Sequence, residues 1–296
     1  GPMKHAIALW DRFWFEPRTT QALGLYRIAL AVATACWLLH YLPDAAVFFS
    51  DQGLLRPETI REHDRFNLSA FLFTSSHPAL VWGTLGVGLG LALALGLGLR
   101  PRLCAFLLFL VLLSLQARNR FLLNGGDVLL RTGLFWLALS PAGGGASYSL
   151  RPQSGLRATC WVQRMIQIQL VVIYVSTALW KWHSPEWQSG TAMYYVSSLV
   201  NHQVQGAELL LNFPQLCVFL TYLVLAVETL LGPLLLIPQT RRYALVVGVG
   251  LHLWILVSMT IPMFSLVTLA MYPAFLSEAD VESLKARWTS WRLGRA

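Results

Sequence analysis

Charged side chains inside apolar runs are the first residues of this sequence that could do chemistry. A charge in hydrocarbon is costly, so such residues usually face the interior of a helix bundle or a wet cavity. The sequence has five of them: Arg27, Asp127, Arg131, Arg164 and Glu228. They predict polar sites inside a membrane domain, where each residue either fixes the structure or contacts a ligand.

The segment NGGDVLLR places three polar residues on one side of a helix. Asn124, Asp127 and Arg131 stand at i, i+3 and i+7, which is the spacing of a single helical face. Asp127 and Arg131 are four residues apart and can pair within the helix. One interpretation is a structural clamp between helices. The other is the polar wall of a ligand cavity, with Gly125 and Gly126 allowing close backbone approach.

A second polar line follows the apolar run at 158–180 and extends just beyond it. Its members recur at helical spacing and are Gln163, Gln167, Tyr174, Thr177 and Lys181. A face this polar is not expected to meet lipid, although it could serve only as hydrogen-bonding glue between helices. Lys181 either extends into the headgroups or acts as a base, because a buried lysine can be a neutral amine that takes a proton.

Two further polar residues lie within apolar runs. Glu228 comes five residues before Pro233, which breaks the helical ladder and frees carbonyl groups that need partners. It is interpreted as a protonated structural acceptor, or as a proton relay or partner of an intramembrane arginine. His252, in GVGLHLWILV, is by default a hydrogen-bonded packing residue, and it would tune protons if it lined a cavity.

The composition requires a membrane to position these residues. Of 296 residues, 56% are hydrophobic and 12% are charged, whereas a soluble domain has about 25% charged residues. We predict an all-α, polytopic transmembrane helical bundle. Residues 6–16 should form an interfacial amphipathic helix, and residues 181–214 an outer re-entrant or interfacial helix. About eight runs are long and apolar enough to span: 22–42, 78–99, 101–118, 121–140, 158–180, 215–237, 243–259 and 262–276. The last two are short and could instead form one broken or re-entrant unit.

The net charge of +8 is explained by a membrane rather than by a nucleic-acid partner, because Lys and Arg gather in short loops between the expected spans. With eight spans and a cytoplasmic N-terminus, inner segments hold 13 of these residues and outer segments six. We therefore expect both termini in the cytoplasm. The four cysteines lie in apolar runs without CxxC spacing, so no metal is expected. Gly1-Pro2 are interpreted as a scar of tag cleavage during expression.

Several motifs in this order resemble one known family. They are LYRIAL, YLPDAAVFFSDQGLL, RNRFLLNGGDVLLRTGLFW, YVSTALWKWHSPEWQSGTAMYY and HLWILVSMTIPMFSLVTLAMYPAFL. Together they resemble the HTTM family, the membrane part of vitamin K-dependent gamma-carboxylase and its bacterial relatives. The expected organisation is a single HTTM-like transmembrane domain at 3–277, followed by a short basic cytoplasmic tail at 278–296.

The resemblance implies an active face on the luminal or periplasmic side and a location in the bacterial inner membrane. In the carboxylase, a lysine deprotonates vitamin K hydroquinone. Oxygenation of the quinol then yields a strong base that removes a glutamate proton before CO2 adds. Lys181 best matches that lysine, which implies a reduced quinone as cofactor and lyase-type chemistry.

Three functions remain open at this stage. The first is an enzyme that activates a quinone or other prenyl lipid, with Lys181 as base. Its cavity would be lined by Asn124, Asp127, Arg131, Arg164, Gln167, Tyr174, Glu228 and His252. The second is a non-enzymatic accessory protein for maturation, export or immunity of a secreted peptide. The third, a transporter, is disfavoured because the segments show no inverted repeat. Expected partners are membrane lipids, a quinone and a secreted peptide or protein substrate.

Overall fold

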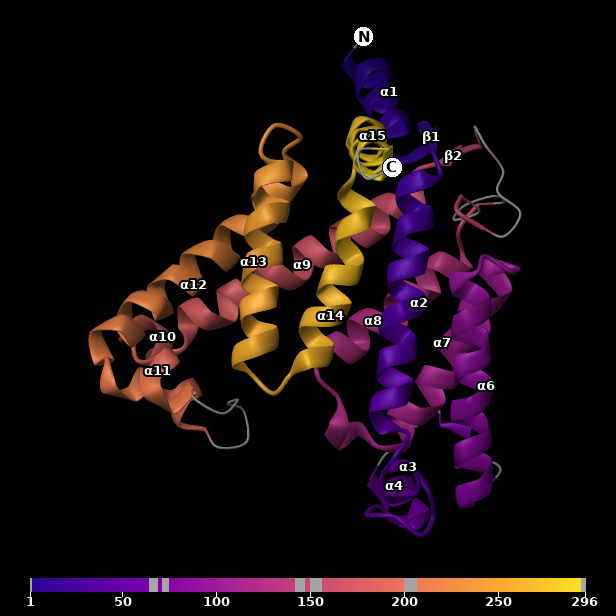
Figure 1. Cartoon of the computed structure of the whole chain (residues 1–296), viewed down its shortest axis with the longest axis vertical. Coiled ribbons are helices and arrows are strands. Elements are labelled where there is room, and N and C mark those ends of the chain that lie inside the picture. Colours follow the sequence, from indigo (N-terminus) through magenta and orange to yellow (C-terminus); the bar gives the residue numbers. More distant parts are fainter. Residues whose placement is uncertain are drawn as a thin grey trace. The chain divides into compact units, whose positions relative to one another are not determined.

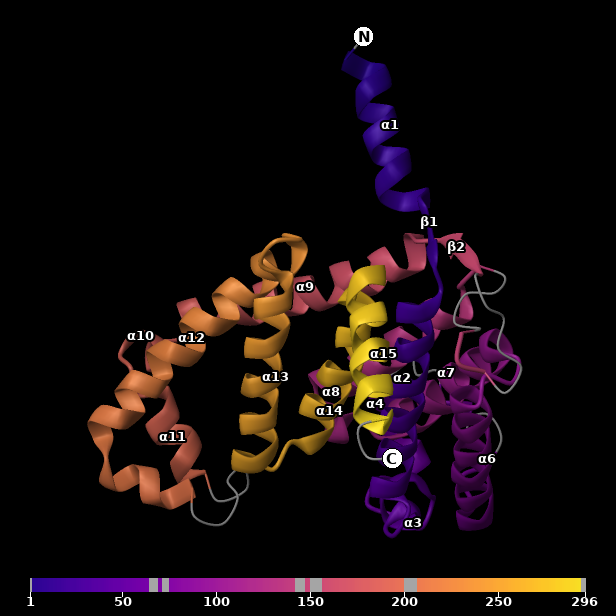
Figure 2. The same ribbon diagram turned by 45° about the horizontal axis from the view of Figure 1, so that its top comes forward.

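The computed structural model describes residues 2–63, 69–70, 75–141, 147–149, 156–199 and 207–293. These residues are almost entirely helical, with one short two-stranded ribbon (Figures 1 and 2). The prediction of an all-α membrane bundle is confirmed. The chain forms two compact units, Gly1–Arg164 with Leu276–Ala296, and Met165–Phe275.

Six helices are long and apolar enough to cross a bilayer. They are α2 (Gln21–Tyr41), α6 (Pro78–Gly96), α7 (Pro101–Arg118), α9 (Trp161–His183), α12 (Pro214–Leu236) and α13 (Arg241–Ser258). Each has 18 to 23 residues, and a span needs about 20 mainly apolar residues. Proline at the first turn of α6, α7 and α12 starts these helices without losing an internal hydrogen bond.

The other two predicted spans form shorter helices. One is α8 (Gly125–Ala138), which begins directly after Asn124. The other is α14 (Pro262–Met271), which a short 3-10 turn, η3 (Tyr272–Phe275), continues. At 1.5 Å per residue, the 14 residues of α8 reach about 21 Å, less than the roughly 30 Å of a hydrocarbon core.

In the first unit, α2, α6, α7 and α8 pack against one another around a leucine-rich core. Gly88 on α6 lets Leu38 of α2 come close, since a Cβ there would lie 3.0 Å from a Leu38 methyl group. The segment after α2 contains α3 (Ala45–Phe49) and α4 (Pro57–His63), and η1 (Arg120–Leu122) follows α7. This unit provides the scaffold for the NGGD segment.

The opposite end of the first unit joins segments that are distant in sequence. Strand β1 (Pro17–Thr19) pairs antiparallel with β2 (Arg157–Thr159), with Arg18 opposite Ala158. Helix α15 (Glu278–Leu293) packs on α2, and Glu278 accepts a hydrogen bond from the Thr19 backbone at 3.0 Å. Helix α1 (Pro2–Phe15) precedes this ribbon and is the predicted amphipathic helix of 6–16.

In the second unit, α12 packs on α13, and α13 on α14. Gly232 of α12 lies against the side chains of Val175 and Tyr174 on α9. Residues 181–214 contain the helices α10 (Pro185–Gln188), α11 (Ala192–Ser198) and η2 (Ala207–Asn212) in place of one continuous helix. Helix α11 packs against α12 and closes one side of this unit.

Candidate functional site

The second unit encloses a cavity of about 220 Å³. Its walls come from α9, α11, α12, α13 and α14, together with Trp187 of α10. Most of the lining is aliphatic or aromatic, including Leu170, Val224 and Phe264. A few polar side chains face this apolar lining, which is the usual composition of a site for a small organic ligand.

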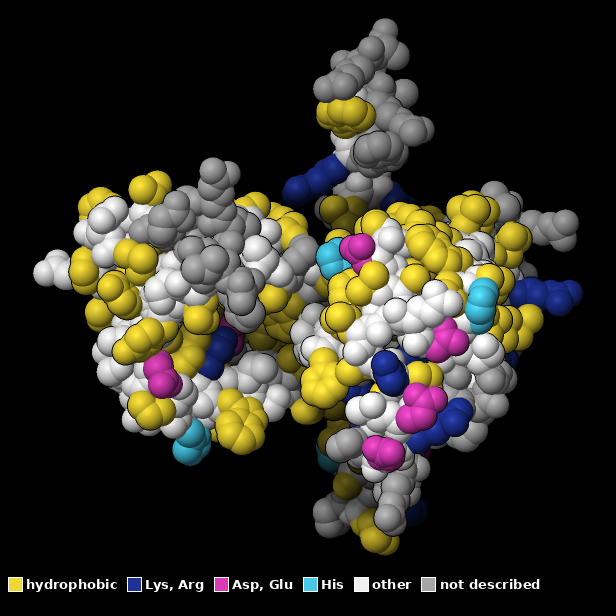
Figure 3. All heavy atoms as spheres, turned by 90° about the horizontal axis from the view of Figure 1, so that it is seen from below, with side chains coloured by type: hydrophobic (Ala, Val, Ile, Leu, Met, Phe, Trp, Pro, Cys, Tyr) yellow, Lys and Arg dark blue, Asp and Glu magenta, His cyan; other side chains and the backbone are white. Residues whose placement is uncertain are grey.

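An ion pair between two helices is the most polar feature of the cavity. Lys181, in the last turn of α9, donates from Nζ to Glu228 Oε2 on α12. The side chains are 23% and 9% exposed. The same Nζ lies 4.7 Å from the ring centroid of Trp187, a cation–π distance. Figure 3 shows basic and acidic side chains together in a hollow on the second unit's face. The amine is thus held in place while part of it stays accessible.

A chain of three hydrogen-bonded side chains lies in the same unit. The hydroxyl group of Tyr174 lies 2.7 Å from His252 Nε2 and 2.7 Å from the hydroxyl group of Tyr272. Gly248, one turn before His252 on α13, makes room for this chain, because a Cβ there would lie 2.1 Å from the Tyr272 oxygen. Tyr174 and His252 also line the cavity, so a built polar network forms part of its wall.

Asn124, Asp127 and Arg131 form a separate cluster in the first unit. The Asn124 side chain accepts from the Gly126 backbone at 2.7 Å, and Asp127 accepts from the Asn124 backbone at 2.6 Å, so the two residues cap α8. Trp37 of α2 donates its indole N–H to Asp127. Arg131 donates to Gln116 of α7 at 2.8 Å. Asp127 and Arg131 therefore hold different neighbouring helices, and the lining of the second unit's cavity contains neither.

Three other predicted residues donate to backbone carbonyl groups that are distant in sequence but belong to the same unit. Arg164 donates to the Phe13 carbonyl at 3.2 Å and lies over the Phe13 ring. Gln167 donates to the Ala274 carbonyl at 2.7 Å. Arg27, fully buried on α2, donates to the carbonyls of Ser147 and Tyr148. These contacts connect helices and turns, while Tyr174, Lys181, Glu228 and His252 are the predicted residues that the cavity brings together.

A family model described as the HTTM domain matches residues 15–279. The chain belongs to the HTTM family. No curated protein and no solved structure matches it significantly. The HTTM match covers nearly the whole chain, from the end of α1 to the start of α15, and includes both polar clusters. The protein is therefore a multi-pass membrane protein related to the carboxylase membrane domain.

Some residues of the cavity wall and of the two polar clusters of this HTTM protein were not predicted from sequence. Tyr272 completes the Tyr174–His252 network, yet a tyrosine near the end of an apolar run is typical of the membrane interface. Trp37 and Gln116 hold Asp127 and Arg131, but they lie on other helices. Trp187 stands in one of the family motifs, but its spacing did not place it beside Lys181. Each of these contacts depends on helix packing, which local spacing does not reveal.

Proposed function

We propose that this HTTM-family protein binds the ring of a quinol or a similar membrane amphiphile in the cavity, and that Lys181 takes a proton from a ring hydroxyl group. The observation that supports this is the position of the Lys181 amine, held between Glu228 and Trp187 at the wall of an apolar cavity. An amine fixed at the wall of a cavity lies within reach of a hydroxyl group bound there, which is the geometric requirement for a general base. The position of this amine and its residue type both support the proposal without reference to the family.

The proton balance of this step is simple. The Lys181–Glu228 pair is neutral as a whole, and the proposed step requires the proton of the pair to lie on Glu228. When the nitrogen is unprotonated, it accepts the ligand proton: the ligand O–H bond breaks, an N–H bond forms, and an oxyanion remains beside the new ammonium group. The apolar lining excludes bulk water, which strengthens the attraction between these two charges.

The size and lining of the cavity favour a ring rather than a whole prenylated lipid. Sites that bury drug-sized ligands have volumes of about 300–1,000 Å³, and this cavity has about 220 Å³. It suits one or two fused rings, with any long tail lying outside among apolar helices. Tyr174 and His252 would hydrogen-bond a ring oxygen. Asn124, Asp127 and Arg131 are not needed, because the α8 cap and the neighbouring helices account for their contacts.

The side of the membrane is part of the proposal. The excess of Lys and Arg in inner segments favours cytoplasmic termini, which would place Lys181, at the far end of α9, toward the periplasm. A bacterial inner membrane supplies quinones to a cavity at that depth. The ligand would then enter from the outer leaflet, without passing through water.

Lipid extraction of the purified protein tests the proposal. Protein solubilised in mild detergent should yield a quinone by mass spectrometry, and a photoreactive naphthoquinone should label peptides of α9, α12 or α13. We expect Lys181→Ala to lower labelling at least about tenfold, as the loss of a charged hydrogen bond predicts. The matched control Lys285→Ala, on exposed α15, should label like the wild type.

Equal labelling of wild type and Lys181→Ala, or labelling only outside these helices, would contradict the proposal. A tight complex with a secreted peptide that is indifferent to Lys181→Ala would replace it with the accessory function.

A further inference from the structure

Helix α1 has an exposed apolar face that the described elements of the first unit do not cover. Met3, Ile7 and Trp10 stand at i, i+4 and i+7, so they share one side of the helix. They are 75%, 53% and 62% exposed. Arg12 lies on the opposite side and Lys4 at the edge of the apolar face, which makes α1 amphipathic. In Figure 2, α1 stands clear of the other helices of the first unit.

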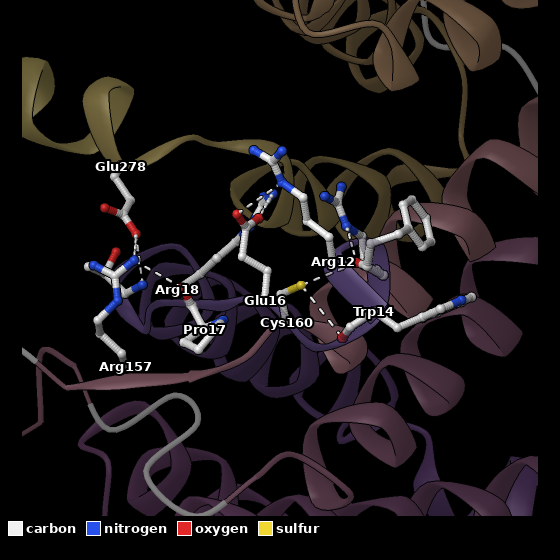
Figure 4. Close-up of polar contacts among 11 residues, drawn as sticks. Arg12, Trp14, Glu16, Pro17, Arg18, Arg157, Cys160 and Glu278 are labelled. Atoms are coloured by element: carbon white, nitrogen blue, oxygen red, sulfur yellow. Dashed lines mark hydrogen bonds and ion pairs between the residues drawn. The ribbon is translucent and has the colours of Figure 1, made fainter. Parts of the chain in front are cut away.

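Among the described residues, the hydrogen bonds between α1 and α9 or the residue before it lie in the last turn of α1. The Cys160 thiol donates to the Trp14 carbonyl at 3.6 Å (Figure 4). It also donates to the Phe13 carbonyl at 3.4 Å, and Arg164 donates to the same carbonyl at 3.2 Å. The final carbonyls of a helix have no partner within the helix, so these contacts cap α1. The docked turn leaves the exposed apolar residues at the free end.

Basic side chains surround this docked turn. Arg18 donates to Glu16 at 3.0 Å, and its guanidinium group lowers the pKa of the Glu16 carboxyl group. Arg157 pairs with Glu278 at 3.4 Å (Figure 4). Arg12 is 3.6 Å from Glu16, but its side chain is 74% exposed. With Arg164, four arginines lie around this turn, where Arg18 and Arg157 pair with glutamates.

We propose that α1 lies on the surface of an anionic lipid leaflet. Its apolar face would enter the boundary between headgroups and acyl chains, and its basic side chains would contact lipid phosphates. The leaflet is close, because α1 ends at Phe15 and the membrane span α2 begins at Gln21. That connection reaches at most about 20 Å. Trp and Arg side chains both suit this boundary, because their apolar parts can lie among acyl chains while their polar groups stay with the headgroups.

Spin labels on opposite faces of α1 test the placement in the full-length protein. Ile7→Cys reports the apolar face and His5→Cys the opposite face, with Cys36→Ser removing the least buried native thiol. The protein is reconstituted in vesicles of phosphatidylcholine with 30% phosphatidylglycerol. We expect collisions with oxygen to dominate at position 7 and collisions with a water-soluble nickel chelate to dominate at position 5.

Charge dependence provides the second arm. The double variant Lys4→Gln, Arg12→Gln should weaken surface binding of α1 in these vesicles by about fivefold per cation removed. Pure phosphatidylcholine should weaken it in the wild type as well. Equal nickel access at positions 5 and 7 in the anionic vesicles would overturn the proposal. Short label-to-label distances between two copies at position 7 would also overturn it and assign the apolar face to self-association.

Discussion

At the scale of single residues, the Lys181–Glu228 pair connects stability with chemistry. A buried pair offsets its loss of hydration only when both partners are present. Glu228 is the more buried partner, so the pair depends on lysine to neutralise a carboxylate inside an apolar unit. The same contact positions the amine above Trp187. The contact that balances the charge of Glu228 is thus also the one that positions the amine of the proposed base.

Breaking this pair from the lysine side should destabilise the protein. Lys181→Met leaves the Glu228 carboxylate without its cation. We expect a cost of about 1–3 kcal/mol, less than for a fully buried pair, because the Lys181 side chain is 23% exposed. Thermal unfolding followed by size-exclusion fluorescence would measure it.

The double variant Lys181→Met, Glu228→Gln removes both charges and should recover most of that loss. Lys285→Met, which breaks an exposed pair on α15, should leave the unfolding temperature unchanged. If the double variant is no more stable than Lys181→Met alone, the ion pair is not what stabilises this contact.

Gly248 allows a second residue-scale prediction. Gly248→Ala would push its new methyl group into the Tyr272 hydroxyl group, 2.1 Å away. We expect a loss of about 1–3 kcal/mol from overpacking and a displaced Tyr174–His252 network. Adding Tyr272→Phe to this variant removes the hydroxyl group and should restore stability. The recovery should be only partial, because the ring carbon that bore the oxygen is still 2.8 Å from the new methyl group.

Gly250, on the same helix, is the matched control. A Cβ there meets no atom within 4 Å, and alanine favours a helix over glycine by roughly 0.8–1.0 kcal/mol. Gly250→Ala should therefore be neutral or stabilising. Equal losses for the two variants would mean that Tyr272 is not packed as described.

At the scale of elements, the start of α8 shows what spacing can and cannot predict. The i, i+3, i+7 pattern correctly placed Asp127 and Arg131 on one helix, whereas Asn124 lies just before that helix as its N-cap. It could not show that Asp127 faces Trp37 and Arg131 faces Gln116, because those partners come from other helices. The capping box involves only Asn124 and Asp127, so spacing alone could have predicted it. It was missed because the predicted span, 121–140, began before Asn124.

The capping box itself is testable. Asn124→Ala removes the side-chain acceptor for the Gly126 N–H group and should cost about 1 kcal/mol. Asn124→Asp keeps an acceptor oxygen and should cost less. Hydrogen exchange of the Gly126 amide group would report the loss locally. Protection that is unchanged in Asn124→Ala would contradict the cap.

At the scale of the whole molecule, contacts at one end constrain the number of membrane crossings. Strand β1 pairs with β2, and Glu278 binds both Thr19 and Arg157, so these segments lie on the same side. Three long helices, α2, α6 and α7, separate β1 from β2. An odd number of crossings does not return the chain to its starting side, so the fourth crossing expected at 121–140 stays a prediction for α8. The same reasoning keeps the crossing expected at 262–276 a prediction for α14 with η3, after α9, α12 and α13.

The prediction of eight crossings gives a sharp test of topology. Glu186→Cys, in the segment before α12, and Glu282→Cys, on α15, should lie on opposite sides of the membrane. An impermeant maleimide added to intact cells should label position 186 and spare position 282 until the membrane is opened. Labelling of both positions, or of 282 alone, would contradict the orientation.

Sequence alone thus predicted the class of fold, the long helices and four residues of the cavity wall. Long apolar runs are recognisable because lipid imposes one rule on every span. The cavity itself and the network with Tyr272 arise where α9, α12, α13 and α14 pack, and periodicity within one helix contains no information about its neighbours. The division of polar residues into two clusters is therefore visible only in three dimensions.

The protonation state of a bound quinol tests the central claim most directly. A naphthohydroquinone is added without oxygen to purified wild-type protein and to Lys181→Met, and the ultraviolet difference spectrum is recorded near neutral pH. Proton transfer to Lys181 predicts the red-shifted spectrum of the quinol anion in the wild type and the neutral spectrum in the variant. A bound quinol that stays neutral in the wild type, or an anion that forms equally in Lys181→Met, would contradict the role of Lys181 as base.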